Sequence, residues 1–265
     1  MTVVTFFFFY KRSAQMESLA TRLNNLALNK GFTVVSDINS ANIIISLGGD
    51  NAFLQATRKT GFRDDCLYVG INTDQLSFYT DFTLKHPEAM FDAIMNEELE
   101  VRRYPVIEVT IDERMSFYCL NECSIRSHVT KAFVMDVYID DFLFETFRGD
   151  GMIISTPTGS TAYNKSVNGA VIDPTLPSMQ VSEIASLNNN EYRTLGSSFV
   201  LGLGRALTLK VDQKGGNTYS AIAVDNEALN VGHAKKLQVQ LADRHINVLK
   251  LKTNSFWQRV KRKFL

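Results

Sequence analysis

Two kinds of hydrophobic pattern alternate along the first hundred residues. Continuous apolar runs that are rich in β-branched and aromatic residues predict strands buried on both faces. Apolar residues at helical spacing, such as Leu19, Leu23 and Leu26, predict helices, and Gly31 is placed to end the first of them. Strands are expected near 1–10, 32–36, 42–47 and 66–72, and helices around 19–26, 52–59 and 87–99. Strands that alternate with helices in this way predict a parallel sheet that is covered on both faces.

The pattern changes after Tyr104, where short segments, many of them alternating, are separated by tight turns. It predicts a mostly antiparallel β domain with two exceptions, a helix starting near Ser160 and a stretch around Ser182. The predicted fold class is a small α/β, Rossmann-like domain at 1–100 and a larger antiparallel β-rich domain at 101–253. We expect the two domains to pack against each other. Clefts between domains are favoured ligand sites, so a ligand is expected to bind there.

The last segment, 254–265, is basic, and its apolar residues fall on one helical face. We expect a helix that packs back on the first domain, and a helix lying on a membrane surface is the alternative. The opening run of ten residues is too short to span a bilayer, and its positive charges follow the apolar stretch, which is the wrong order for a secretory signal. These observations predict a cytoplasmic protein.

Charge and cysteine content narrow the range of partners. The 28 lysines and arginines balance 28 aspartates and glutamates, so no overall charge favours nucleic acid or an anionic membrane. Cys66, Cys119 and Cys123 make an odd count without metal-like spacing. We therefore expect free thiols in a reducing compartment and no metal held by a cluster of protein side chains.

The apolar run 43–47 ends in Gly48, Gly49 and Asp50, immediately before a predicted helix. Ligands of a parallel sheet bind beyond the carboxyl ends of its strands. Glycines at that position let backbone N–H groups approach phosphate oxygens, and the helix N-terminus adds partial positive charge. The two glycines are therefore predicted to form a phosphate-binding turn.

Asp50 needs a separate explanation, because a carboxylate repels phosphate. It can accept the proton of a hydroxyl nucleophile, or it can help to hold a divalent cation. The alternative is that Asp50 only caps the following helix. A glycine pair followed by aspartate does not decide between these readings by itself.

Two other polar stretches carry candidate chemistry. Asn121 and Glu122 end an apolar run, and if a bend or strand end brings these neighbours together they can hydrogen-bond the two hydroxyls of a ribose. The segment 148–166 places Asp150 between two glycines and continues into a hydroxyl-rich loop. Hydroxyls and free N–H groups at a helix start suit a diphosphate or the edge of a base. An ordinary Ser/Thr-rich turn is the alternative.

These motifs, in this order and spacing, resemble the NAD kinase family, and the similarity continues through 183–197 to the basic helix that contains Trp257. The chain resembles most the compact enzymes of Gram-positive bacteria. The resemblance implies transfer of a phosphoryl group from ATP or polyphosphate to the adenosine 2′-hydroxyl of NAD, which gives NADP. It also implies a divalent cation, Mg²⁺, on the donor phosphates, and a dimer or tetramer whose sites lie near subunit boundaries.

The resemblance implies a role for each matching position. Asp50 would be the base that activates the 2′-hydroxyl. Asn121 and Glu122 would hold NAD hydroxyls or the nicotinamide end. Arg148 and Asp150 would border the substrate, with Asp150 reaching the ligand of a neighbouring subunit. The residues expected around the adenine and its ribose are Thr158, Thr161, Ala162, Tyr163, Asn164, Lys165 and Ser166, and the backbone of Ala185 would contact a base.

Three positions depart from the family pattern, in which the turn reads GGDG followed by threonine or asparagine. Here Asn51 and Ala52 follow Asp50. Asparagine tolerates positive φ, so the turn can be retained, but its side chain would crowd a phosphate. Ala52 lacks a polar contact that could be worth about 1–3 kcal/mol. We therefore expect an altered donor preference or a slow enzyme. Asn226 stands where relatives often carry histidine, which predicts weaker stacking on the ligand.

Two other functions stay open at this point. The first is a protein of the same fold that binds NAD or NADP without turnover, although a pure binder has no need for Asp50. The second is a related kinase that acts on another alcohol, such as a lipid or a sugar. The Asn121–Glu122 pair and the loop 156–166 disfavour the second alternative.

Overall fold

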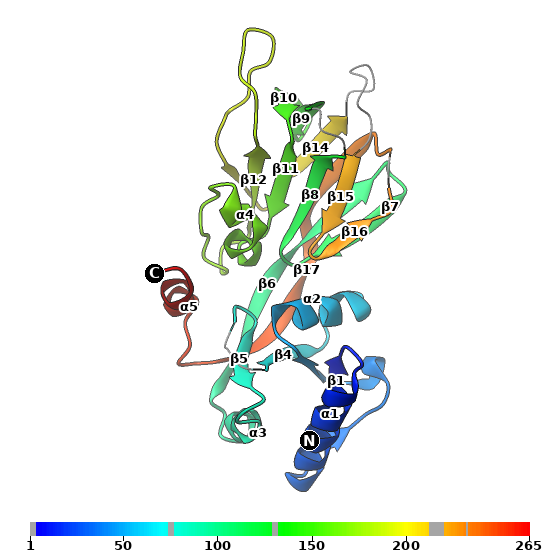
Figure 1. Cartoon of the computed structure of the whole chain (residues 1–265), viewed down its shortest axis with the longest axis vertical. Coiled ribbons are helices and arrows are strands. Elements are labelled where there is room, and N and C mark those ends of the chain that lie inside the picture. Colours follow the sequence, from blue (N-terminus) through cyan, green and yellow to red (C-terminus); the bar gives the residue numbers. More distant parts are fainter. Residues whose placement is uncertain (1–3, 74–76, 129–131, 212–219, 232) are drawn as a thin grey trace. The chain divides into compact units, whose positions relative to one another are not determined.

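The structure of the chain is a computed structural model that describes residues 4–73, 77–128, 132–211, 220–231 and 233–265. The chain divides into two compact units, Met1–Tyr104 with His245–Leu265 and Pro105–Arg244 (Figure 1). Strands β6 (Leu99–Ile111) and β17 (Lys236–Leu251) contribute residues to both units. Each unit is described by itself below.

The first unit is an α/β structure whose strands pair in parallel. The strand order is β2-β1-β3-β4, the last part of β17 follows β4, and β5 also pairs with β4. Its elements are β1 (Thr5–Tyr10), α1 (Ala14–Asn29), β2 (Thr33–Val34), a 3₁₀ turn (Ile38–Ser40), β3 (Ile43–Leu47), α2 (Asp50–Lys59), β4 (Leu67–Asn72), β5 (Thr80–Thr83), α3 (Glu88–Met95) and α5 (Phe256–Phe264). The predicted parallel sheet is confirmed.

Side-chain alternation explains why both faces of this sheet are covered. Ile43, Ile45 and Leu47 of β3 belong to a core that also contains buried residues of α1 and α3. Ile44 between them is fully buried as well, and adjacent strand residues face opposite sides. Helix α2 packs against β3 and β4, with the ring of Phe53 6.0 Å from that of Tyr68. Strand β3 is therefore buried on both faces, as its unbroken apolar run predicts.

Local signals set the ends of most helices. Ser13 caps α1 by accepting a hydrogen bond from the Met16 N–H, and Gly31 follows its C-terminal end with a φ of +84°. Helix α3 is shorter than the predicted helix 87–99. It ends at Met95, Glu97 adopts a φ of +55°, and Leu99 already begins β6. Pairing of β6 in the sheet outweighs the helix propensity of this segment.

The second unit contains two antiparallel sheets that share one hydrophobic core. One sheet contains β10-β9-β14-β17 in that order together with the pair β6-β7, and the other has the order β13-β12-β11-β8-β15-β16. The elements are β7 (Met115–Cys119), β8 (Glu122–Ser127), β9 (Phe133–Ile139), β10 (Phe142–Gly149), β11 (Gly151–Ser155), a 3₁₀ turn (Thr158–Thr161), α4 (Tyr163–Ser166), β12 (Ser178–Ile184), β13 (Phe199–Gly202), β14 (Ala206–Val211), β15 (Ser220–Val224) and β16 (Glu227–Leu229). The predicted antiparallel β-rich domain is confirmed.

Two local predictions for this unit need correction. The stretch around Ser182 is no exception to the β pattern, because Ser182 is a fully buried residue of strand β12 that pairs with Ile153 of β11. The helix expected near Ser160 is only a 3₁₀ turn followed by the single turn of α4. The three cysteines are buried free thiols, as expected. Within the described residues, no helix combines the length and apolar character that a membrane crossing requires.

Candidate functional site

The glycine turn lies at the carboxyl end of strand β3 and leads directly into α2. Gly48 and Gly49 adopt φ values of +126° and +81°, a region that residues with a side chain rarely occupy. A side chain at Gly49 would also meet Asn72, whose Nδ2 lies 3.2 Å from the ideal Cβ position. Backbone conformation therefore requires glycine at both positions.

The N–H groups of the two glycines do not point to a free space. Both donate to the carbonyl oxygen of Ile71 in β4, at 3.0 Å from Gly48 and 3.3 Å from Gly49. These two groups are thus engaged with β4 in this structure, and their contact with a phosphate stays a prediction. The first intrahelical hydrogen bond of α2 is from the Phe53 N–H to the Gly49 carbonyl, so the three preceding N–H groups have no partner within the helix. These groups, at 50–52, are the ones available to an anion.

Asp50 is the first residue of α2, and its carboxylate does not cap that helix, since Gly49 is the N-cap residue. The carboxylate accepts three hydrogen bonds from the segment 77–79 instead. Ser77 Oγ donates to Oδ1 at 2.6 Å, the Tyr79 N–H donates to Oδ1 at 2.9 Å, and the Phe78 N–H donates to Oδ2 at 3.2 Å. The interpretation of Asp50 as a helix cap is therefore excluded, and the carboxylate is held in one orientation.

Asn51 and Ala52 lie inside the first turn of α2. Neither has a positive φ, so the tolerance of asparagine for that conformation is not what allows Asn51 here. The Asn51 side chain is exposed. The Ala52 methyl group lies 3.3 Å from the position that a Cβ on Gly48 would take, so these two small residues face each other across the turn.

In the second unit, a two-residue bend at Leu120 and Asn121 separates β7 from β8, and Glu122 is the first residue of β8. The carboxylate of Asp225, from the turn between β15 and β16, accepts hydrogen bonds from the N–H groups of Leu120 at 3.0 Å and Asn121 at 2.7 Å. The Asp225 N–H in turn donates to the Glu122 carbonyl at 2.8 Å. Asp225 therefore holds the bend that a shared site for the two adjacent residues requires.

The Glu122 side chain is only 7% exposed, and its Oε2 has no hydrogen-bond partner within the described residues. Burial, followed by the negative charge of Asp225, raises the pKa of Glu122 to about 8, although the Tyr163 N–H opposes the shift. Glu122 is consequently protonated for the most part at neutral pH. A buried carboxyl oxygen without a partner is a candidate for a ligand hydroxyl.

The threonine hydroxyls of the hydroxyl-rich loop donate hydrogen bonds to backbone carbonyl oxygens of the protein itself. Thr156 Oγ1 and Thr158 Oγ1 both donate to the Leu120 carbonyl, at 2.5 and 2.9 Å, and Thr161 Oγ1 donates to the Thr158 carbonyl at 3.2 Å. The backbone at Gly159 runs so close to Asn121 that a Cβ would lie 1.9 Å from its carbonyl oxygen. The structure thus brings the loop and the Asn121–Glu122 turn together.

The buried side chain of Asn164 connects the short helix α4 to strand β12. It is fully buried, and its Oδ1 accepts a hydrogen bond of 2.6 Å from Ser182 Oγ. A Cβ on Gly169 would lie 2.1 Å from Asn164 Nδ2, and this nitrogen has no hydrogen-bond partner within the described residues. Ala162 and Tyr163 are half-buried, whereas Lys165 and Ser166 are exposed.

Three predicted residues lie away from this turn. Arg148 and exposed Asp150 adjoin one end of β11, where the Asp150 N–H donates to the Ile184 carbonyl at 3.0 Å, next to exposed Ala185. Glu122 pairs with Ser155 at the other end of the same strand. Five strand residues separate the two groups by roughly 16 Å. Exposed Asn226 is next to Asp225 in the chain and therefore lies near the end of β11 that pairs with Glu122.

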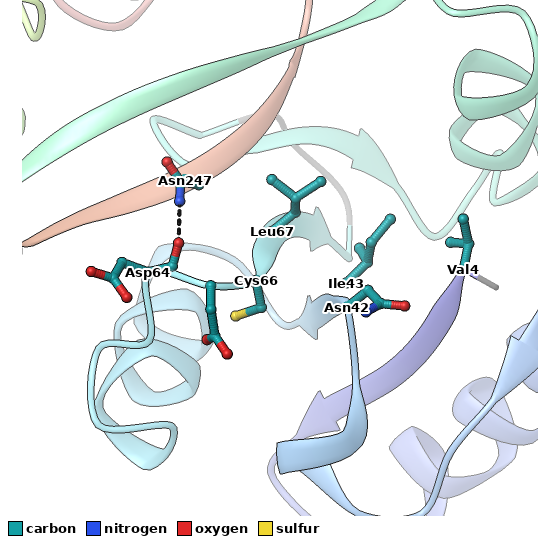
Figure 2. Close-up of a pocket in the computed structure, with 8 residues that line it drawn as sticks. Val4, Asn42, Ile43, Asp64, Cys66, Leu67 and Asn247 are labelled. Atoms are coloured by element: carbon teal, nitrogen blue, oxygen red, sulfur yellow. Dashed lines mark hydrogen bonds between the residues drawn. The ribbon is translucent and has the colours of Figure 1, made fainter. Parts of the chain in front are cut away.

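A cavity of about 360 Å³ in the first unit lies at the amino ends of β3 and β4 (Figure 2). Its lining includes Ile43, Cys66 and Leu67, and Asn247 Nδ2 donates to the Asp64 carbonyl at 2.6 Å. Asp50 follows the carboxyl end of β3, so this cavity is not part of the glycine turn. Among the described residues, no three His, Cys, Asp or Glu side chains gather as metal ligands would.

The structure adds residues that the sequence analysis missed. Ser77, Phe78 and Tyr79 hold Asp50, and Asp225 holds the turn at Asn121. The polar stretch that follows the strand ending at Asn72 was a signal for the first group, because it also lies beyond the carboxyl end of a parallel strand. No local pattern marks Asp225, which lies more than a hundred residues from its partners.

Comparison with known proteins identifies the family. Residues 120–251 match the model of the ATP-NAD kinase C-terminal domain. The chain is 60% identical to NAD kinase 2 of Halalkalibacterium halodurans over 98% of this chain and 97% of that protein. It is 59% identical to NAD kinase 2 of Bacillus subtilis, with the same coverage.

Two solved structures share the fold at low sequence identity. The yeast NADH kinase complexed with NADH has a TM-score of 0.81 and 15% sequence identity. The match covers 98% of this chain and 87% of the yeast chain. An NAD kinase from Archaeoglobus fulgidus in complex with ATP has a TM-score of 0.75 and 19% sequence identity. The match covers 98% of this chain and 97% of the archaeal chain. Together with the near full-length identity to the bacterial enzymes, these findings show that the chain belongs to the NAD kinase family.

Proposed function

We propose that this protein transfers the γ-phosphoryl group of ATP to the adenosine 2′-hydroxyl of NAD and so forms NADP. Family membership supports the reaction, and one observation carries the assignment of its base. The Asp50 carboxylate stands at the start of a helix beside a glycine turn and is held by three donors. A carboxylate at this position can accept the proton of a hydroxyl nucleophile while the helix N-terminus binds a phosphate.

Asp50 Oδ2 accepts only the Phe78 N–H at 3.2 Å among the described residues. A lone pair on this oxygen is therefore free to take the proton of the 2′-hydroxyl as the oxygen attacks the γ-phosphorus. The bond from that phosphorus to the bridging oxygen breaks, and ADP leaves with the electron pair. Phosphoryl transfer requires mainly alignment and charge stabilisation, so a fixed carboxylate and free N–H groups at 50–52 suit it.

The NAD-binding residues of the second unit are also part of the proposal. Glu122 and Asn121 hold ribose hydroxyls, and the buried Glu122 Oε2 without a partner supports this role. The hydroxyls of Thr158 and Thr161 bond to the chain, so these residues shape the loop, and backbone groups of 161–166 and the Tyr163 ring face the ligand. Asn226 lies on the turn next to Asp225 and extends the same surface.

Arg148, Asp150 and Ala185 adjoin the far end of β11 from Glu122, so we assign them to the ligand of a neighbouring subunit. This assignment requires a homo-oligomer, a dimer or tetramer. Sedimentation as a monomer at micromolar concentration would argue against the shared site.

Magnesium enters this proposal as part of the donor, bound to the ATP phosphates. Mg²⁺ commonly binds through substrate phosphates and one or two carboxylates rather than through a cage of protein ligands. We also propose a cytoplasmic location, which the three free buried thiols support.

A coupled assay for NADP tests the function directly. Purified protein is supplied with NAD or NADH and with ATP, other nucleoside triphosphates or polyphosphate, each with and without Mg²⁺. We expect NADP from NAD and ATP, and no product from Asp50→Asn. Absence of product from the unmodified protein with every donor, together with NAD binding in calorimetry, would favour a binding protein instead.

A further inference from the structure

The first unit contains a fully buried charge cluster that no predicted role uses. Lys250 is 0% exposed, Arg259 is 3% exposed, and both form ion pairs with Asp81, from Lys250 Nζ to Asp81 Oδ1 at 3.0 Å. Lys250 lies in β17, and Arg259 is the one buried residue of the C-terminal helix α5. Asp81 lies in β5, and its Oδ2 also accepts the Leu251 N–H at 2.8 Å.

Both cations also bind the segment that holds Asp50. Arg259 Nη1 donates to the carbonyl oxygens of Ser77 at 3.2 Å and Phe78 at 2.6 Å. Lys250 Nζ donates to the same Phe78 carbonyl at 3.1 Å. The N–H groups of Phe78 and Tyr79 and the Ser77 hydroxyl point the other way, toward the Asp50 carboxylate.

The segment 77–79 is therefore fixed from two sides. Its carbonyl groups bond to buried cations, and its donors bond to the carboxylate. The Phe78 ring adds an apolar contact, with centroids 6.0 Å from Phe256 and 5.9 Å from Phe264 of α5. The C-terminal helix thus contacts this segment through both a guanidinium group and two aromatic rings.

Stability alone does not account for this cluster. Removing two cations and a carboxylate from water carries a desolvation cost that their mutual attraction offsets only in part, and apolar side chains of similar volume often stabilise a protein as well or better. Arginine offers donors in a planar fork, and Arg259 uses two of its nitrogens on carbonyl oxygens and a carboxylate at once. The geometry of the fork specifies where the segment lies.

From these contacts we infer that Arg259 is a positioning residue for catalysis: it fixes the segment 77–79 and thereby the orientation of the Asp50 carboxylate. The inference rests on the proposed function of Asp50. If Arg259 has this role, phosphoryl transfer requires α5 to be packed on the segment 77–79. NAD binding, which is proposed for residues of the second unit, does not depend on Arg259.

Steady-state kinetics of five variants test this inference, and Arg259→Ala among them serves for rescue by added guanidinium ion. Arg259→Met removes the charge and the fork but keeps much of the side-chain volume, and Arg259→Lys keeps the charge alone. Exposed Arg262 on the same helix provides the matched control Arg262→Met. Asp50→Asn removes the proposed base and gives the reference rate for its complete loss.

We expect Arg259→Met to lower kcat about 30- to 100-fold while the KM for NAD changes less than about threefold, because a displacement of roughly 1 Å at a reacting group can cost a factor of that size. Arg259→Lys should fall between the wild type and Arg259→Met, and Arg262→Met should stay within about twofold of the wild type. Added guanidinium ion should restore part of the activity of Arg259→Ala, which a general loss of folding would not allow.

Three results would overturn the inference. Near-normal kcat in folded Arg259→Met would show that the segment keeps its position without the guanidinium. Equal losses of kcat and NAD affinity, with a lowered unfolding midpoint and no rescue by guanidinium, would assign Arg259 to the stability of the fold. If the wild type makes no NADP, the proposed function fails and this inference fails with it, whereas an active wild type beside an active Arg259→Met rejects the inference alone.

Discussion

The Asp225 carboxylate accepts a hydrogen bond of 2.7 Å from the backbone N–H of Asn121, although 104 residues separate the two along the chain. The same carboxylate accepts the Leu120 N–H and lies close enough to raise the pKa of Glu122. One side chain therefore fixes the shape of the proposed ribose-binding turn and adds to the effect of burial, which is the main cause of the raised pKa of Glu122.

Asp225→Asn should weaken this turn, because Oδ1 accepts the Asn121 and Leu120 N–H groups and Oδ2 also accepts the Leu120 N–H at 3.1 Å, whereas one of these two atoms becomes a donor in asparagine. We expect a loss of about 1–3 kcal/mol in the free energy of unfolding and weaker NAD binding. Urea unfolding and calorimetry would measure the two effects. The same substitution at exposed Asp141 is the matched control, and equal behaviour of both variants would contradict the role of Asp225.

Glu122 predicts a pH dependence of stability. Its pKa is raised from 4.5 to about 8 in the folded chain, so the native state binds more protons than the unfolded state between these values. The stabilisation from the protonated carboxyl is fully present below about pH 4.5 and is lost as the pH rises through about 8.

The variant Glu122→Gln should remove up to about 1.4 kcal/mol per pH unit from the slope of the free energy of unfolding in this window. Urea denaturation at several pH values from 5.5 to about 8.5 would compare the variant with the wild type. Identical slopes would mean that Glu122 is ionised in the folded protein.

Asp50→Asn should abolish NADP formation and leave NAD affinity within about threefold, since the carboxylate acts in the transition state. Ser77→Ala, which removes one of the three hydrogen bonds to Asp50 but keeps the base, should lower kcat only about tenfold. Single-turnover kinetics with saturating ATP would measure both. Near-normal turnover of Asp50→Asn would require another residue to activate the hydroxyl.

The glycine turn allows a test of the departures at Asn51 and Ala52. Asn51→Gly with Ala52→Thr should lower the KM for the donor or raise kcat, because it removes a side chain near the free N–H groups and adds a hydroxyl worth about 1 kcal/mol. Glycine inside the first turn of α2 should also cost a few tenths to about 1 kcal/mol of stability. A slower enzyme would show that Asn51 and Ala52 are part of a working donor site.

Gly159→Ala tests the close approach of the loop to Asn121. The added Cβ would lie 1.9 Å from the Asn121 carbonyl oxygen, so the backbone must shift and NAD binding should fall at least about tenfold. Gly202 in strand β13 has no atom within 4 Å of its Cβ position, and Gly202→Ala is the matched control. Wild-type NAD affinity in Gly159→Ala would remove this turn from the proposed site.

Hydrophobic periodicity determined the fold class of both units. The unbroken apolar run of β3 required burial on two faces, and the alternating segments after Tyr104 required antiparallel sheets. Local chemistry also determined the turn at Gly48 and Gly49, where only glycine adopts the observed φ values without strain. These are short-range properties, and each can be read from a few neighbouring residues.

Only the tertiary structure decided how the polar groups are paired. The glycine N–H groups bond to Ile71, and Asp50 is held by 77–79 instead of capping its helix. The basic face expected of the C-terminal helix contains one buried residue, Arg259, whose partner Asp81 lies 178 residues away. Hydrogen bonds and ion pairs between distant segments depend on which strands become neighbours, and no periodicity in a single segment encodes that. For this reason the sequence identified Asp50, and the fold identified the groups that orient it.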